Sequence, residues 1–167
     1  AQFRGQDSLA NQGRGHVVAA LIRKAVLAAE LGHEAFEVWG DGSATRDFVY
    51  VTDVADGIAH VVTARDSFAG ATFNLGSGRE TTIREMATII ATAAGRGVKP
   101  RFRAEKPVGY PRRVMSVAHA AERLGYVAAT SLSTGIRRTV EWLRASGQVA
   151  SWVAAAADAP ASRRAAA

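Results

Sequence analysis

Residues 39–57 read WGDGSATRDFVYVTDVADG, and this stretch decides how the rest of the chain is interpreted. It opens with a polar, glycine-bearing turn at 40–43, which no regular element tolerates. The charged pair Arg46-Asp47 follows, directly against the bulky run FVYV at 48–51. Because that run has no polar alternation, it predicts a strand buried on both faces. Thr52 then stands where it could cap a helix.

Outside this stretch, the apolar spacing predicts further helices and strands. Helices are expected at 16–31, 53–64, 82–95, 116–124 and 133–145, and strands at 36–40, 48–51, 71–78 and 99–103. Thr82 and Glu85 have the spacing of a capping box, and Gly125 is a natural helix stop. Strands alternating with helices indicate an α/β arrangement. Since successive βαβ units for a complete sheet are missing, we expect this chain to be a portion of something larger.

The last twenty or so residues are rich in alanine, and we expect them to fray except for about one helical turn around Trp152. The sequence is therefore divided into a folded region at 1–147 and an Ala-rich tail at 148–167.

Composition restricts the classes of ligand and partner that are expected for the protein. The 167 residues suit one domain and carry a net charge of +6, with 21 Lys+Arg against 15 Asp+Glu. The arginines are spread along the chain without a basic block or interleaved aromatics, so a small anion such as a phosphate is favoured over nucleic acid. No apolar run approaches the roughly 20 residues that cross a bilayer, so no membrane partner is expected. With no cysteine, the protein is expected in a reducing, cytoplasmic setting.

Several catalytic and cofactor motifs are missing from the sequence. Gly76-Ser77-Gly78 lacks the third glycine of a dinucleotide fingerprint, since Thr81 stands there, so a structural turn is favoured. The four histidines show no metal-ligand spacing, and no metal is expected. The three tyrosines have no lysine four positions later: Tyr50, Tyr110 and Tyr126 are followed there by Val54, Val114 and Thr130. No catalytic residue is assigned.

Arg46 is the sharpest local signal for binding. An arginine held next to a strand can clamp a phosphate through two parallel hydrogen bonds. Trp39 could offer a flat wall to a sugar or base, and His16 stands at a helix start, where anions are favoured. The alternatives are an ion pair of Arg46 with Asp47 or Asp53, a core tryptophan, and a merely polar helix start at His16.

Three segments in order, VWGDGSATRDFVYVTDVADGI, FNLGSGRETTIREMATII and KPVGYPRRVMSVAHAAERLGY with the following SLSTGIRRTVEWL, are similar to extended short-chain dehydrogenase/reductases that act on nucleotide sugars. Within that NAD-dependent epimerase/dehydratase family, the GDP-L-fucose-synthase-like branch is the most similar. RGHVVAALIRKAVLAAELG resembles the His-bearing helix of this branch. The resemblance covers about residues 5–145 and implies the substrate-binding portion of a Rossmann-type α/β fold.

The resemblance also implies roles for individual residues. His16 would lie beside the nicotinamide of NAD or NADP. Substrate contacts are implied at five positions: Lys24, Trp39, Arg46, Arg112 and Arg113. Arg46, Arg112 and Arg113 would hold the diphosphate of a nucleotide-diphosphate sugar.

This sequence also departs from the family pattern. Val108 replaces an aspartate that the family places against the substrate, which bears on sugar specificity. The Gly-rich cofactor loop and the Tyr-x-x-x-Lys pair of the family's Rossmann units are missing. We therefore expect a substrate-binding part that is inactive on its own, as a homo-oligomer or with a missing Rossmann-domain partner. The alternative is a non-catalytic nucleotide-sugar-binding or interaction module from a split or degenerate enzyme.

Overall fold

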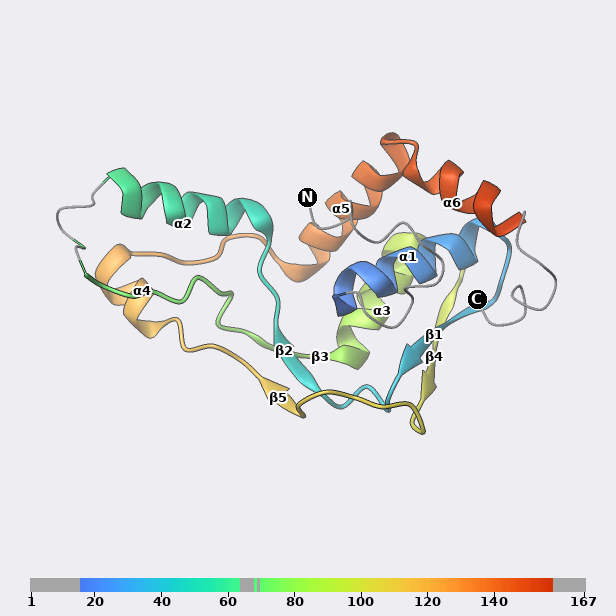
Figure 1. Cartoon of the computed structure of the whole chain (residues 1–167), viewed down its shortest axis with the longest axis horizontal. Helices are drawn as coiled ribbons and strands as arrows, with labels where there is room; N and C mark the ends of the chain where they lie inside the picture. Colours follow the sequence, from blue (N-terminus) through green and yellow to red (C-terminus); the bar gives the residue numbers. More distant parts are fainter. Residues whose placement is uncertain (1–15, 64–67, 69, 158–167) are drawn as a thin grey trace.

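The computed structural model describes residues 16–63, 68 and 70–157 (Figure 1). The helices are α1 (Val17–Glu30), α2 (Val51–Thr63), α3 (Ile83–Ala94), α4 (Ala118–Leu124), α5 (Leu132–Ala145) and α6 (Gln148–Ala157). The strands are β1 (Ala35–Trp39), β2 (Thr45–Asp47), β3 (Glu80–Thr82), β4 (Lys99–Arg103) and β5 (Arg112–Arg113). The chain is thus an α/β fold, as the sequence predicts. None of the helices described is long and apolar enough to cross a membrane.

The main core lies between α1, α3, α5, α6 and the strand pair β1 and β4, which Figure 1 shows on the right. Ile22 and Val26 on α1 and Met86 and Ile90 on α3 are fully buried, at the four-residue spacing that puts side chains on one helix face. The amphipathic spacing that predicted these helices is therefore the spacing that forms the core.

The strands form two small sheets, which are joined by the turn at 40–43. Strands β1 and β4 are parallel, with Ala35 opposite Lys99 and Trp39 opposite Arg103. The second sheet has the order β3-β2-β5, with β3 antiparallel and β5 parallel to β2. The turn at 40–43 carries the chain from the first sheet to the second, since it joins β1 to β2.

The strand predicted at 48–51 is wrong. Strand β2 lies just before it, and Val51 is already the first residue of α2, with 70% of its surface exposed. Strand β3 pairs with Thr45 to Asp47, and strand β5 pairs with Thr45 and Arg46. Neither strand reaches Phe48, so the ladder of β2 ends before the predicted strand begins. Thr52 consequently lies inside α2 and does not cap it.

The strand predicted at 71–78 is also wrong. Within the described chain this segment has no ladder partner, and the strand β3 follows the Gly76-Ser77-Gly78 turn. Phe73 and Leu75 instead pack against Leu124 and Tyr126, in a small second cluster beside α4. The apolar residues of this segment correctly indicated buried side chains. They do not require that the backbone pairs with another strand, so the strand was predicted where none forms.

Several other predictions that rest on local signals are confirmed. Helix α3 begins with a capping box, in which the Thr82 hydroxyl accepts from the Glu85 N–H while the Glu85 carboxylate accepts from the Thr82 N–H. Strand β4 spans the predicted 99–103, and Gly125 ends α4 in the left-handed conformation. Helix α6 is longer than the single turn expected, because Val149 and Trp152 are buried in the main core. Residues 158–167 of the predicted tail lie outside the described residues.

Helices α2 and α4 lie together away from the main core, on the left of Figure 1. Their shared cluster is small, and α2 leaves several apolar side chains on the surface. Val51, Ile58 and Val62 are 70%, 53% and 65% exposed. Buried Asp53 ties the start of α2 to the segment before α5, because its carboxylate accepts from the Thr130 N–H at 3.0 Å and the Thr130 hydroxyl at 2.9 Å.

Candidate functional site

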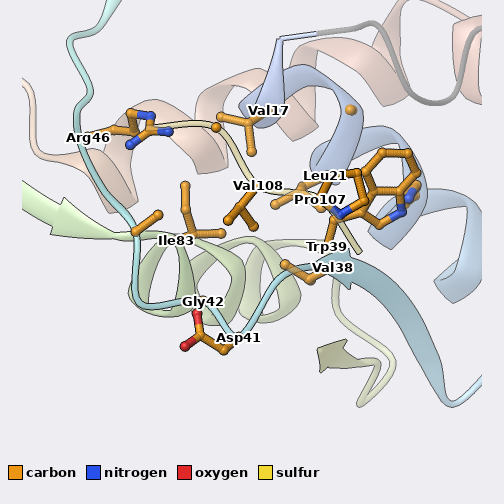
Figure 2. Close-up of a pocket in the computed structure, with 14 residues that line it drawn as sticks. Val17, Leu21, Val38, Trp39, Asp41, Gly42, Arg46, Ile83, Pro107 and Val108 are labelled. Carbon is orange, nitrogen blue, oxygen red and sulfur yellow. The ribbon is translucent and has the colours of Figure 1, made fainter. Parts of the chain in front are cut away.

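A cavity of about 210 Å³ lies between α1, the turn at 40–43, β2 and the segment 106–109 (Figure 2). Figure 2 shows Arg46 at one end and Trp39 at the other. The middle is apolar, lined by Val17, Leu21, Val38, Ile83, Pro107 and Val108. Lys24 joins Trp39 in the lining, so three of the predicted substrate-binding residues meet in one cavity.

Lys24 projects from α1, one turn beyond Leu21. Its ammonium donates to the carbonyl oxygen of Glu37 at 3.4 Å and lies 5.8 Å from the centre of the Trp39 ring. Burial lowers the pKa of Lys24, and the negative charge of Glu37 opposes that effect. An ammonium that is partly desolvated before a ligand arrives gains from a nearby anion.

Trp39 ends β1 and is held by its neighbour on the same face of the strand. The indole N–H donates to the Glu37 carboxylate at 2.8 Å, and the other oxygen of that carboxylate faces the Arg103 guanidinium at 3.3 Å. The Trp39 side chain is 38% exposed, so the alternative of a core tryptophan is wrong. Its ring forms a fixed, accessible wall.

The turn after Trp39 requires its glycines. Gly40 has a φ of +81°, and a Cβ there would lie 2.2 Å from Cγ1 of Val108. Gly42 has a φ of +83°, and a Cβ there would lie 2.6 Å from the Phe102 ring. Gly40 therefore lets the segment with Val108 close one side of the cavity.

Arg46 is the middle residue of β2, and its guanidinium donates to the carbonyl oxygen of Thr45 at 2.6 Å. A Cβ on Gly109 would lie 3.6 Å from Nη2 of Arg46, so the chain passes close to the guanidinium. The carboxylates proposed as its ion-pair partners are engaged elsewhere: Asp47 with Ser77 and Gly78, and Asp53 with Thr130.

Strand alternation separates the two other predicted arginines. Arg113 lies opposite Arg46 in the parallel register, so both occupy the same face of the sheet. Arg112 lies on the other face, where it pairs with Glu80 at 3.0 Å. The Thr45 hydroxyl donates to the same carboxylate at 2.6 Å, and these two partners lower the pKa of Glu80. Neither Arg112 nor Arg113 lines the cavity.

His16 caps the backbone of α1 without a side-chain capping bond, and it lies outside the cavity lining. The structure thus brings Lys24, Trp39 and Arg46 together, puts Arg113 beside Arg46, and leaves His16 and Arg112 apart.

The Gly76-Ser77-Gly78 turn is filled by the protein's own carboxylate. Asp47 accepts from the Ser77 N–H at 2.9 Å, from the Gly78 N–H at 3.1 Å and from the Ser77 hydroxyl. A Cβ on Gly76 would lie 2.4 Å from Oδ2 of Asp47, which is why this position is glycine. A turn whose N–H groups already bind Asp47 does not fit a dinucleotide pyrophosphate.

Sequence reasoning singled out Val108 but assigned no role to Lys106. The Lys106 ammonium lies 6.0 Å from the centre of the Trp39 ring, and Pro107, Val108 and Gly109 line the cavity. Lys106 stands 67 positions after Trp39, so no local pattern could have joined the two.

Comparisons with known proteins identify relatives of this chain. Residues 5–76 match the model of the NAD dependent epimerase/dehydratase family. GDP-L-fucose synthase 1 of Arabidopsis thaliana is 37% identical over 128 residues, which are 76% of this chain and 38% of that protein. UDP-glucose 4-epimerase of Mycolicibacterium smegmatis is 37% identical over 131 residues, which are 78% of this chain and 40% of that protein.

A solved structure shares the fold. The GDP-L-fucose synthetase from Naegleria fowleri bound to NADP superposes with a TM-score of 0.73 at 23% identity, over 83% of this chain and 43% of that one. The chain therefore spans about two fifths of the length of the relatives that it matches.

Proposed function

The chain belongs to the NAD-dependent epimerase/dehydratase family, and from this premise we propose that it binds the substrate of a nucleotide-sugar epimerase, reductase or dehydratase. The observation that carries the proposal is the convergence of Lys24, Trp39 and Arg46 on one cavity (Figure 2). A nucleotide sugar combines an anionic diphosphate with rings that present flat or apolar faces. Cationic ends and an apolar middle complement such a molecule.

Each residue has a separate task in this proposal. Arg46 clamps the diphosphate, since a guanidinium on a strand can donate two parallel hydrogen bonds. Arg113, on the same face of the sheet, adds positive charge beside Arg46. Lys24 supplies a second cation, and Trp39 a flat wall. Arg112 contributes from the opposite face through its pair with Glu80, which supports β2 in position.

Binding is assigned to residues 1–147, because every residue that lines the cavity lies in this range. Residues 148–157, the described part of the region 148–167, do not line the cavity, and α6 contributes to the core. The cytoplasmic setting expected from the cysteine-free sequence is part of the proposal.

We expect no turnover from this chain alone. Hydride and proton transfer in the family require a nicotinamide cofactor and a Tyr-x-x-x-Lys pair, and no tyrosine here is followed by lysine four positions later. The alternative is a module that binds the nucleotide sugar, or a partner protein, without any reaction.

NAD or NADP is the cofactor implied for the complete enzyme. The N–H groups of the Gly76-Ser77-Gly78 turn already bind the Asp47 carboxylate, so His16 remains the residue of this chain that we assign to the nicotinamide site.

The exposed apolar side chains of α2 suggest a surface that another part of the protein covers. Val51, Ile58 and Val62 form an apolar face, and the nearby segment 71–75 has no ladder partner in the described chain. Since the chain spans two fifths of its relatives, we propose that a dinucleotide-binding part covers this surface. Molar mass by light scattering tests it: a defined dimer of this chain would instead assign the surface to a second copy.

Calorimetric titration of GDP- and UDP-sugars tests the proposed function. Arg46→Ala should weaken binding at least about tenfold, because a bidentate charge-assisted contact is lost. Arg137→Ala is the matched control, since Arg137 lies on α5 and pairs with Glu141. Absence of diphosphate-dependent binding in the wild type would leave only a structural module.

A further inference from the structure

Lys106 is fixed next to Trp39 by the backbone. The carbonyl oxygen of Arg103 accepts from the Gly40 N–H at 2.8 Å and from the Lys106 N–H at 3.0 Å. Gly40 directly follows Trp39, so a single acceptor joins the end of β1 to the start of the segment 106–109. The position of Lys106 relative to the indole is thus set by main-chain hydrogen bonds.

The residues after Lys106 are held along the cavity. Val108 rests on Gly40, where a Cβ would approach its Cγ1 to 2.2 Å, and Gly109 passes Nη2 of Arg46. The segment therefore runs from the Trp39 end of the cavity to the Arg46 end. Lys106 stands at the beginning of this segment, next to Pro107 of the cavity lining, and its own side chain is exposed and lies outside that lining.

Two ammonium groups share one indole at this end of the cavity. Lys24 and Lys106 lie 5.8 Å and 6.0 Å from the Trp39 ring centre. The carboxylate of Glu37 is engaged by the Trp39 indole through one oxygen and by Arg103 through the other. An anion that contacts both ammonium groups would be stabilised by each of them.

We propose that Lys106 is a ligand-binding residue of this site, and that it forms with Lys24 a second cationic subsite that receives a phosphoryl oxygen of the ligand above Trp39. The inference rests on the proposed function and adds to it a residue and a subsite. The ligand is then held from two directions, by Arg46 at one end of the cavity and by the two lysines at the other.

The test is calorimetric titration of GDP, UDP-glucose and UDP-glucuronate into the full chain and its variants. Lys106→Ala should weaken all three by a similar factor of about ten, since each carries the diphosphate. Lys106→Arg should retain most of the affinity because the charge remains. Lys99→Ala is the matched control, as it removes an exposed lysine from the same sheet, four residues before the position opposite Trp39.

Each outcome decides between the assignments. Equal affinities of Lys106→Ala and Lys99→Ala, with Arg46→Ala still impaired, overturn the inference and leave the proposed function standing. A loss confined to UDP-glucuronate overturns the phosphoryl assignment, because the lysines would then hold the sugar carboxylate. If the wild type binds none of the three ligands, the proposed function and this inference fall together.

Discussion

The carboxylate of Asp47 is bound by the N–H and the hydroxyl of Ser77, thirty positions later in the chain. The Gly78 N–H completes the arrangement at 3.1 Å. Asp47 and Arg46 are neighbours on β2, so alternation turns one side chain toward this turn and the other toward the cavity. The contact therefore holds in place the strand that carries Arg46, and it explains why a charged pair adjoins a glycine-rich region.

Asp47→Ala should lower the free energy of unfolding by about 2–3 kcal/mol, because hydrogen bonds to a charged group are lost and the N–H groups of the turn lose their partner. Urea denaturation followed by circular dichroism measures the change. Asp56→Ala, at an exposed position on α2, is the control and should change the unfolding free energy by less than about 0.5 kcal/mol. Equal effects of the two substitutions would show that the turn does not depend on Asp47.

Gly40→Ala should weaken ligand binding as well as stability. The left-handed φ of +81° costs an alanine about 1–2 kcal/mol, and the new Cβ pushes Val108 out of the cavity wall. Adding Val108→Ala removes Cγ1 and with it the clash. The double variant should therefore regain ligand affinity, but it should remain less stable because the strained backbone conformation at position 40 persists. Calorimetric titration and thermal denaturation separate the two effects. Unchanged affinity in Gly40→Ala would mean that the segment 106–109 does not shape the site.

Lys24→Met should raise stability at neutral pH while weakening binding of the anion. Because burial lowers the pKa of Lys24 in the folded protein, the unfolded chain binds more protons between that lowered pKa and 10.5. The contribution of Lys24 to stability therefore rises with pH through this window, and Lys24→Met should flatten the rise. Urea midpoints of both proteins from pH 7 to about pH 11 give the comparison.

Ligand affinity should depend on pH in the opposite direction. A bound anion favours the charged form of Lys24, so affinity in the wild type should fall as pH rises through the pKa of that lysine. Titrations across the same pH range should show this fall in the wild type and a weaker one in Lys24→Met. Parallel profiles would contradict the contact with Lys24.

Tyr126→Phe should leave stability unchanged or raise it by up to about 1 kcal/mol. The hydroxyl of Tyr126 is buried without a hydrogen-bond partner among the residues described, so removing it loses no bond. Burial raises the pKa of Tyr126, with smaller contributions from Asp53, Asp47 and Asp56. Above pH 10.0 the unfolded chain then loses this proton first, and the stability of the wild type should fall relative to Tyr126→Phe. Denaturation at pH 7 and above pH 10.0 tests both statements, and a destabilised variant at pH 7 would indicate a partner for the hydroxyl.

Trp152→Ala should destabilise the protein by about 3 kcal/mol or more while leaving the affinity of the folded molecules unchanged. Trp152 is 8% exposed in the main core, and the Arg23 guanidinium lies 5.1 Å from the centre of its ring. Trp142→Ala, at a position 51% exposed, should cost less. If Trp152→Ala reduced affinity in proportion to stability, α6 would belong to the binding region.

Local signals predicted most of the helices. Thr82 and Glu85 cap α3 as their spacing indicates, and Gly125 ends α4, since these contacts join residues close in sequence. The strands at 48–51 and 71–78 were misplaced for the opposite reason. Strand pairing joins Thr45 to Thr82 and Arg112, and apolar content does not reveal those distant partners.

The candidate site divides in the same way. Local features selected Arg46 and Trp39, and the family resemblance added Lys24. The resemblance also grouped Arg112 with Arg113, which the pleat of β5 turns to opposite faces. Lys106 was missed because a shared carbonyl of Arg103 brings it to Trp39.

The sequence by itself determined the α/β class, the amphipathic helices, the caps at Thr82 and Gly125 and the family resemblance, because those properties depend on residue types and their spacing along the chain. The tertiary structure alone decided which charges meet. In the folded chain Asp47 binds the Gly76-Ser77-Gly78 turn, Arg46 lines the cavity and Lys106 lies beside the Trp39 ring. Such pairings depend on ladder register and backbone contacts between residues 30 to 67 positions apart, and no local pattern encodes them.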